Sequence, residues 1–386
     1  MTERERFRAV LHFEQVDRVP NVEIGYWEEA LVRWQKEGLP GDIPIRPPKG
    51  GDRRYTRHSG ELTRYFGLDA HDVAYNVTIS DLPEPSPTTE VIAQDEETKT
   101  IRWSHGLVRK CLKSNEGIFN ELDWPVKCRS DWERIRKTIF PGWHRISAGS
   151  PASLPREDRD FAAMLAVPGF FWALRNLMGF EKTCMIFHED PEMAGEMLDH
   201  FGDYYLAQCK LVLKHYEPEY VQFDEDMAYN HGPMLSPAML EKFLLPQYEK
   251  VVSYINSEGI DVVGVDSDGF PDEMIPVLHQ AGVNLWMPLE IVCRKGRDDL
   301  VTLCRRYPWL RIIGGIDKTA LSRGKDAIDQ ELTKIAPLVE RGGYIPTVDH
   351  KVPPEVSLDA YKYYVQQKAA ALETKSWEHV AARTRR

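Results

Sequence analysis

The sequence predicts an α/β fold, a (β/α)8 TIM barrel with N-terminal insertions, from three observations. Short apolar strands alternate with helices over residues 159–371, which is typical of parallel strands joined by helical crossovers. No G-x-G-x-x-G motif follows any of these strands, so the fingerprint of a dinucleotide-binding fold is missing. The chain of 386 residues is long enough for one barrel of about 250 residues with additions. We therefore expect a single domain over residues 1–386.

The chain is expected to enter the barrel through a helix, a strand and a second helix. Phe7, Val10 and Leu11 recur at helical spacing, which predicts a short amphipathic helix. The apolar pattern then predicts a short strand at residues 22–24 and a helix at residues 27–37.

Residues 39–158 are expected to contain the insertions. Residues 39–60 are rich in Pro, Gly and basic side chains, which indicates a lid or, more commonly, a solvated loop. Residues 91–93 and 100–103 flank an acidic turn and predict a β-hairpin, which does not fit a simple alternation of strands and helices. A helix is expected to begin at Ser130.

The regular part should supply most of the barrel. Strands are expected at residues 161–167, 220–223, 261–265, 283–287, 310–314 and 343–346, and helices at 171–178, 191–213, 237–257, 272–281, 297–305, 325–341 and 358–370. Residues 372–386 are polar and are expected to form a tail.

Composition limits the partners of the protein. Lys and Arg number 49 against 60 Asp and Glu, a net charge of −11, which argues against nucleic acid or an anionic membrane as a partner. No apolar run is long enough for a membrane span, and the charged N-terminus does not resemble a secretion signal. The six Cys form no C-x-x-C pair and are expected to be thiols in a reducing compartment. These features predict a soluble cytoplasmic protein; a homodimer stays open.

Five successive predicted strands are followed by carboxylates, at the end where barrels carry their reactive groups. These acids are Asp224, Glu225, Asp226, Asp266, Asp268, Glu290, Asp317 and Asp349. Any one of them alone is more often a helix cap or a solvated loop residue. Converging carboxylates repel one another, so the set predicts a metal ion, a cationic ligand or groups suited to proton transfer.

Roles can be assigned to these side chains as expectations. His350 is the one His at such a strand end, and with Asp266 and Asp268 it would suit a divalent metal, zinc before iron or manganese. A lone His is nevertheless more often structural. The residues expected to transfer protons are Asp224, Asp226 and Glu290, and those expected to contact the substrate are Tyr26, Trp27, Phe170 and Asp317, although aromatic side chains in such places often pack in the core instead.

Several segments, in a fixed order along the chain to about residue 370, match one known family. They are Arg4–Pro20 (RERFRAVLHFEQVDRVP), Leu177–Glu192 (LMGFEKTCMIFHEDPE), His231-Gly232-Pro233 with Leu235-Ser236-Pro237, Gly314–Asp317, Gly342–Ile345 and Asp349–Pro354. Through them the chain resembles the uroporphyrinogen decarboxylase superfamily, whose members are α/β barrels and include decarboxylases and cobalamin-linked methyltransferases.

Two departures indicate the branch. The decarboxylases of the superfamily carry an Arg-rich stretch after the first strand, whereas Glu23–Ala30 contains no Arg. The thiol-alkylating methyltransferases bind zinc through a His-x-Cys pair and a later Cys, and the matching positions here are Asp266, Asp268 and His350. The resemblance therefore implies methyl transfer with harder ligands, which suits a substrate oxygen such as that of a methyl ether.

Three hypotheses follow. The first is a methyltransferase that moves a methyl group between a small substrate, O-methylated in the simplest case, and a corrinoid (cobalamin) cofactor, which is bound directly or, more in keeping with the resemblance, carried on a partner protein. The second is a metal-free decarboxylase or lyase acting on a small carboxylic acid. The third is a non-catalytic binding protein for a cationic ligand, which would need an aromatic cage beside the acids.

Overall fold

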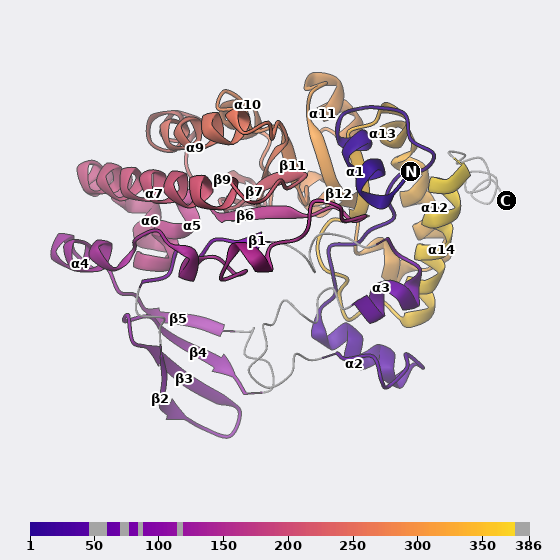
Figure 1. Cartoon of the computed structure of the whole chain (residues 1–386). Coiled ribbons are helices and arrows are strands. Elements are labelled where there is room, and N and C mark those ends of the chain that lie inside the picture. Colours follow the sequence, from indigo (N-terminus) through magenta and orange to yellow (C-terminus); the bar gives the residue numbers. More distant parts are fainter. Residues whose placement is uncertain (46–59, 70–76, 84–87, 114–118, 375–386) are drawn as a thin grey trace.

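The computed structural model of the chain is an α/β barrel with a separate antiparallel sheet attached to one side (Figure 1). The structure describes residues 1–45, 60–69, 77–83, 88–113 and 119–374. Most of the predicted loop at 39–60, and the predicted tail from residue 375 onward, lie outside the described residues.

Seven parallel strands form the sheet of the barrel. In spatial order they are β1 (Val77–Thr78), β6 (Met164–Pro168), β7 (Tyr220–Asp224), β10 (Val263–Asp266), β11 (Leu285–Met287), β12 (Arg311–Ile316) and β13 (Tyr344–Val348). Each strand of the regular part was expected within a few residues of its place, so the predicted α/β barrel is confirmed. Because all seven strands run the same way, their C-terminal ends meet on one side, which we call the mouth.

The expected strand at residues 22–24 is wrong in detail. Residues 22–24 are in no strand, and the isolated bridge nearest to them joins Tyr26 and Val352. The N–H of Val348 donates to the carboxylate of Glu23 at 3.0 Å instead of to a backbone carbonyl, so no regular ladder forms there. The side chain of Glu23 is buried against Lys368, whose ammonium group also donates to the carbonyl of Val22 at 2.9 Å.

Helices cover the outside of the barrel, as the crossover pattern requires. They are α5 (Phe170–Met178), α6 (Phe180–Glu189), α7 (Pro191–Val212), α8 (Pro237–Met239) with a π-helical turn (Leu240–Leu244), α9 (Leu245–Ser257), α10 (Ile275–His279), α11 (Leu300–Arg306), α12 (Lys325–Lys334), α13 (Ala336–Arg341) and α14 (Leu358–Thr374). Helix α7 begins where Asp190 accepts a hydrogen bond from the N–H of Met193 at 2.9 Å, with Pro191 in the first turn. The single helix expected at 325–341 is two helices, because Pro337 cannot donate the hydrogen bond that would continue α12.

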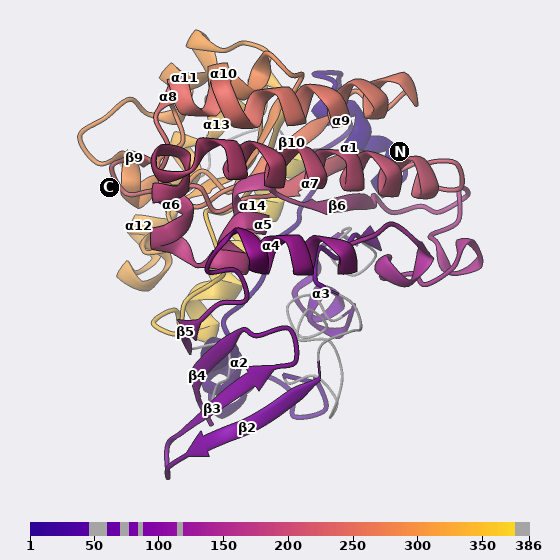
Figure 2. The same ribbon diagram turned by 90° about the vertical axis from the view of Figure 1, so that its left-hand side faces the viewer.

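The N-terminal part adds α1 (Glu3–Leu11), α2 (Glu28–Lys36), α3 (Gly60–Phe66) and α4 (Arg129–Ile135). The predicted hairpin is confirmed and belongs to a larger antiparallel sheet of β2 (Thr89–Gln94), β3 (Thr98–Trp103), β4 (Val108–Leu112) and β5 (Phe119–Asp123). Figure 2 shows this sheet extending away from the barrel below α4 and α5. Short elements complete the chain: β8 (Ala228–Tyr229), β9 (Gly232–Pro233) and 3-10 turns at Arg136–Thr138, Trp143–Arg145, Pro151–Ser153, Ile291–Arg294 and Ala320–Arg323.

None of the helices in the described residues has both the length and the apolar character needed to cross a membrane. All six cysteines are free thiols.

Candidate functional site

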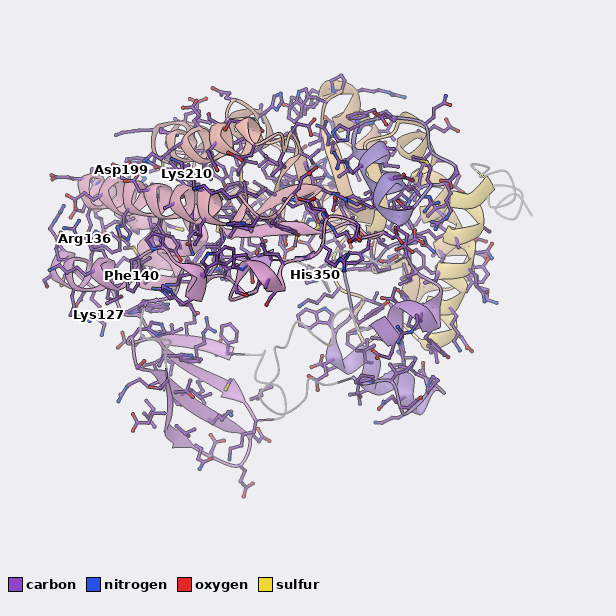
Figure 3. All side chains as sticks on the ribbon, viewed as in Figure 1. Lys127, Arg136, Phe140, Asp199, Lys210 and His350 are labelled. Atoms are coloured by element: carbon purple, nitrogen blue, oxygen red, sulfur yellow. The ribbon has the colours of Figure 1, made fainter. Side chains whose placement is uncertain are left out.

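The mouth of the barrel brings together an imidazole and a carboxylate from distant strands. His350 follows β13 and Asp268 follows β10, and Nε2 of His350 lies 3.4 Å from Oδ2 of Asp268. Two strands, β11 and β12, lie between β10 and β13 in the sheet, so this pair reaches across part of the mouth. Figure 3 labels His350 on the side of the barrel that faces α2, away from the labelled residues of α7, Asp199 and Lys210.

A second carboxylate faces this pair. Asp226, which follows β7 with a positive φ of 51°, accepts a backbone hydrogen bond from Asp268. Burial raises the pKa of Asp226, and the nearby charge of Asp268 raises it further, against the opposing effect of Arg175 at 3.9 Å. Burial acts in the same direction on Asp268, but its hydrogen bond with His350 and the charges of His350 and Lys318 outweigh it and leave the pKa of Asp268 below its usual range. The environment therefore raises the pKa of Asp226 and lowers that of Asp268, as in sites that need one acid and one base.

An aromatic side chain borders the pair. The ring of Trp27 lies 5.9 Å from the imidazole of His350, between centroids, and the ammonium group of Lys351 lies 4.7 Å from the Trp27 ring. Trp27 is 36% exposed, so its indole is accessible at the mouth. That Trp27 contacts the substrate stays a prediction.

Glu290, which follows β11, is held by its neighbours. It forms an ion pair with Lys318 and accepts a hydrogen bond from the N–H of Gly269 at 3.0 Å. Gly269 has a positive φ of 87°, and a Cβ at this position would lie 2.8 Å from the backbone of Tyr229, so the turn requires glycine. In this arrangement Glu290 neutralises Lys318 and fixes the loop that carries Asp268.

Two further acids at the strand ends, Glu225 and Asp349, are buried and accept hydrogen bonds from backbone N–H groups. The sequence gave no sign that their role differs from that of the neighbouring acids. Glu225 accepts the N–H groups of Phe170, Phe171 and Trp172 at 2.7, 2.9 and 3.2 Å, and also the hydroxyl of Tyr248. It therefore caps the start of α5, and burial raises its pKa to about 7.

Asp349 has a similar structural task on the opposite side of the mouth. It accepts the N–H of Ile291 at 2.6 Å and that of Lys318 at 3.0 Å, so it ties together the loops after β11 and β12. Burial raises its pKa to about 6, against the charge of Lys318. His350 follows directly, so these hydrogen bonds also fix the backbone that presents the imidazole.

Two predicted pocket residues lie in the core instead. Tyr26 is 5% exposed and hydrogen-bonds the hydroxyl of Tyr361 at 2.9 Å, because its side chain turns toward α14. Phe170 is fully buried and packs on Phe223 and Tyr248 at centroid distances of 6.0 and 5.0 Å. Neither side chain is available to a ligand in this arrangement.

The three remaining predicted site residues, Asp317, Asp224 and Asp266, differ in their surroundings. Asp317 is buried and accepts from the N–H and hydroxyl of Thr319 at 2.8 and 2.6 Å, so it stabilises its own loop. Asp224 accepts a hydrogen bond from Gln222 at 2.9 Å and lines a cavity. Asp266 is partly buried at the end of β10, opposite Asp224 in the ladder.

A divalent metal on Asp266, Asp268 and His350 requires three converging donors. Among the residues that the structure describes, no group of three His, Cys, Asp or Glu side chains has the arrangement of a metal site. As placed, these three donors do not converge on one ion, so no step is assigned to a metal.

The residues that sequence reasoning missed differ in the signal they gave. Lys318 and Lys351 directly follow predicted site residues, so their loops had been identified. Glu225 stands between two predicted acids, and only its capping contacts distinguish it. Arg175 lies within α5 and carried no sequence signal.

The sequence profile of the family described as uroporphyrinogen decarboxylase matches residues 168–369. Among solved structures, the chain is similar to a methyltransferase from Methanosarcina mazei with a TM-score of 0.62 and 14% sequence identity, over 96% of this chain and 99% of that chain. At this identity the likeness shows a shared fold. No curated protein matches the chain.

Proposed function

The chain belongs to the uroporphyrinogen decarboxylase family, and we propose that within it the protein is a methyltransferase rather than a porphyrinogen decarboxylase. The observation that carries the proposal is the contact between His350 and Asp268 across the mouth, with Asp226 beside it. The fold shared with a methyltransferase over nearly the whole of both chains supports it.

The charges near the first strand argue against a polyanionic porphyrinogen. The segment Glu23–Ala30 contains no Arg, and the nearest one, Arg33, is directed to Glu37 at 2.6 Å and to the carbonyls of Pro354 and Glu355 at 2.9 Å. Of the residues that the structure describes, Asp226 and Asp268 are the ones that substrate carboxylates would approach at the His350 contact, and both would repel them.

The proposed reaction removes a methyl group from an oxygen of a small substrate. The carbon–oxygen bond breaks, the methyl group passes to the acceptor, and the leaving oxygen takes a proton. In this proposal Asp226 supplies that proton, which its raised pKa supports, and the Asp268–His350 pair, in contact at 3.4 Å, then returns a proton to Asp226. A corrinoid on a partner protein would supply the nucleophile that accepts the methyl group.

A resident divalent metal remains a separate prediction, which elemental analysis tests. Stoichiometric metal in the purified protein that is lost in both Asp268→Ala and His350→Ala would support it. Metal content that neither substitution changes would remove it. The proton-transfer proposal does not depend on the result.

The activity test is a spectroscopic titration. Reduced cobalamin, or a corrinoid protein, is mixed with the protein and candidate methoxylated compounds, and methylation of the corrinoid is followed by its absorbance. The expected result is methylation that depends on both the protein and the methyl donor. Release of carbon dioxide from a small carboxylic acid without corrinoid would instead favour a lyase, and binding without turnover would favour a receptor.

The free thiols and the acidic net charge fit a protein of the reducing cytoplasm, and we include that location in the proposal.

A further inference from the structure

A cavity of about 380 Å³ lies between the mouth of the barrel and the antiparallel sheet. On the barrel side it is lined by the C-terminal ends of three neighbouring strands, at Thr78 of β1, Pro168 of β6 and Asp224 of β7. Asp224 is paired with Asp266 in the ladder and stands two residues before Asp226. The cavity therefore reaches the C-terminal end of β7, the strand that Asp226 follows, and its volume falls within the range of small-molecule pockets.

The opposite wall comes from the inserted sheet. Trp103 ends β3, and His105 and Leu107 belong to the turn that leads into β4. From the barrel, α5 contributes Trp172 and Asn176. Two indoles from separate parts of the fold thus line one cavity, which suits a flat ring.

The cations near the cavity are already engaged. Arg109 donates to Glu121 at 2.7 and 3.1 Å, and its guanidinium lies 5.4 Å from the ring of Trp103. The guanidinium of Arg175 lies 5.4 Å from the ring of Trp172. Because a guanidinium group already lies near each indole, a cationic ligand that approached either ring would be repelled.

Anionic ligands are opposed by the acids of the cavity. Asp81 is 9% exposed and accepts a hydrogen bond from the side chain of Asn176. Asp224 adds a second carboxylate. With neither charge sign favoured, the lining selects an uncharged molecule.

One polar atom of the lining has no partner. Nδ1 of His105 is buried without a hydrogen bond among the described residues. Burial lowers the pKa of His105, and the charge of Arg109 lowers it further, which favours the neutral ring. In that form Nδ1 is a donor or an acceptor according to the tautomer. A ligand hydroxyl satisfies either form, because a hydroxyl both donates and accepts.

We propose that this cavity binds the methyl-bearing substrate, and that the substrate is a small, flat, uncharged aromatic compound whose hydroxyl group bonds to His105. That this ligand is the substrate rests on the methyltransferase function proposed above, whereas its size, shape and charge are inferred from the cavity alone. The inserted antiparallel sheet is then a specificity element, since it supplies Trp103 and His105.

Equilibrium binding tests the proposal on the full chain without corrinoid. Four probes of similar size are titrated by calorimetry: 2-methoxyphenol, methoxybenzene without the hydroxyl, 2-methoxybenzoate as the anion and phenyltrimethylammonium as the cation. We expect 2-methoxyphenol to bind about tenfold tighter than each of the others, the usual effect of one buried hydrogen bond or of an unfavourable buried charge. Equal affinity for all four probes, or tightest binding of a charged one, would overturn the proposal.

Variants locate the site. His105→Ala should weaken 2-methoxyphenol about tenfold and change methoxybenzene less than twofold, because only the hydroxyl contact is lost. Trp172→Leu should weaken both. Glu96→Gln, on the exposed turn between β2 and β3, is the matched control and should change neither. If His105→Ala does not fold, His105→Gln keeps a polar side chain and should weaken 2-methoxyphenol less than Trp172→Leu does. An effect of Glu96→Gln as large as that of His105→Ala would contradict the assignment.

The two proposals fail separately. Selective binding of 2-methoxyphenol without methyl transfer to corrinoid would remove the methyltransferase function and leave the cavity assignment standing. Methyl transfer from 2-methoxyphenol with a KM that His105→Ala and Trp172→Leu leave unchanged would remove the cavity assignment and leave the function standing.

Discussion

Nε2 of His350 lies 3.4 Å from Oδ2 of Asp268, although β11 and β12 separate the strands that carry them. A flat sheet would hold the ends of such strands too far apart for this contact, at about 4.8 Å for each neighbouring pair. The curvature of the barrel is therefore what makes the pair, and side chains of the loops between them, Lys318 among them, complete its surroundings.

The first prediction concerns methyl transfer. His350→Ala and Asp268→Asn should each lower the rate of methyl transfer by about 10²- to 10⁴-fold, the usual contribution of a positioned acid or base. The measurement is the initial rate of corrinoid methylation, with thermal unfolding as a check that each variant is folded. His231→Ala, at an exposed histidine, is the control and should retain its rate. Loss of less than threefold in both site variants would remove the pair from the reaction.

The second prediction concerns the buried cap of α5. Glu225→Ala should lower the free energy of unfolding by about 3 kcal/mol or more, because three amides and the hydroxyl of Tyr248 lose their acceptor inside the protein. Urea unfolding measures the change. Glu241→Ala, at an exposed glutamate, should change the free energy by less than about 0.5 kcal/mol. Similar values for the two variants would show that the cap is dispensable.

The third prediction contrasts two glycines. A Cβ at Gly169 would lie 2.2 Å from the carboxylate carbon of Glu225, so Gly169→Ala should destabilise the protein by several kcal/mol or prevent its folding. A Cβ at Gly195, within α7, would meet nothing within 4 Å, so Gly195→Ala should stabilise it by up to about 1 kcal/mol through helix propensity. Urea midpoints of the two variants should move in opposite directions; a shift of the same sign would contradict the packing described here.

The fourth prediction concerns pH. Burial raises the pKa of Asp81, so the folded protein holds this proton more tightly than the unfolded chain does. The resulting stability is present below the unfolded pKa of about 4 and is lost as the pH rises through the folded pKa. Asp81→Asn should therefore gain stability relative to the wild type as the pH rises above about 4. Urea unfolding across that range measures the difference; Glu96→Gln should show none, and a difference that shrinks as the pH rises would reverse the assignment.

The sequence predicted the barrel well because its evidence is local. Apolar strands and helices alternate in a pattern that only a parallel sheet with crossovers accommodates, and the strand bounds came within a few residues. The same rule placed Asp226, Asp268 and His350 at one end of the barrel.

The roles of individual side chains were harder to predict from the sequence. Asp226 and Glu225 are adjacent, yet one faces the mouth and the other caps α5, because the chain turns through a positive φ at Asp226. Tyr26 follows a strand-like segment but packs on Tyr361, more than 300 residues away in the chain. Such outcomes depend on partners that no local pattern reveals. The placement of the inserted sheet against α5 is of the same kind.

The buried contact between Glu23 and Lys368 joins the first barrel segment to the last helix. Until α14 has been synthesised, the carboxylate of Glu23 has no ammonium group to receive it in the interior. Trp27 and His350 both precede α14 in the chain. A nascent chain interrupted shortly before α14 would therefore carry nearly every residue of the site and still lack the ammonium group that pairs with Glu23.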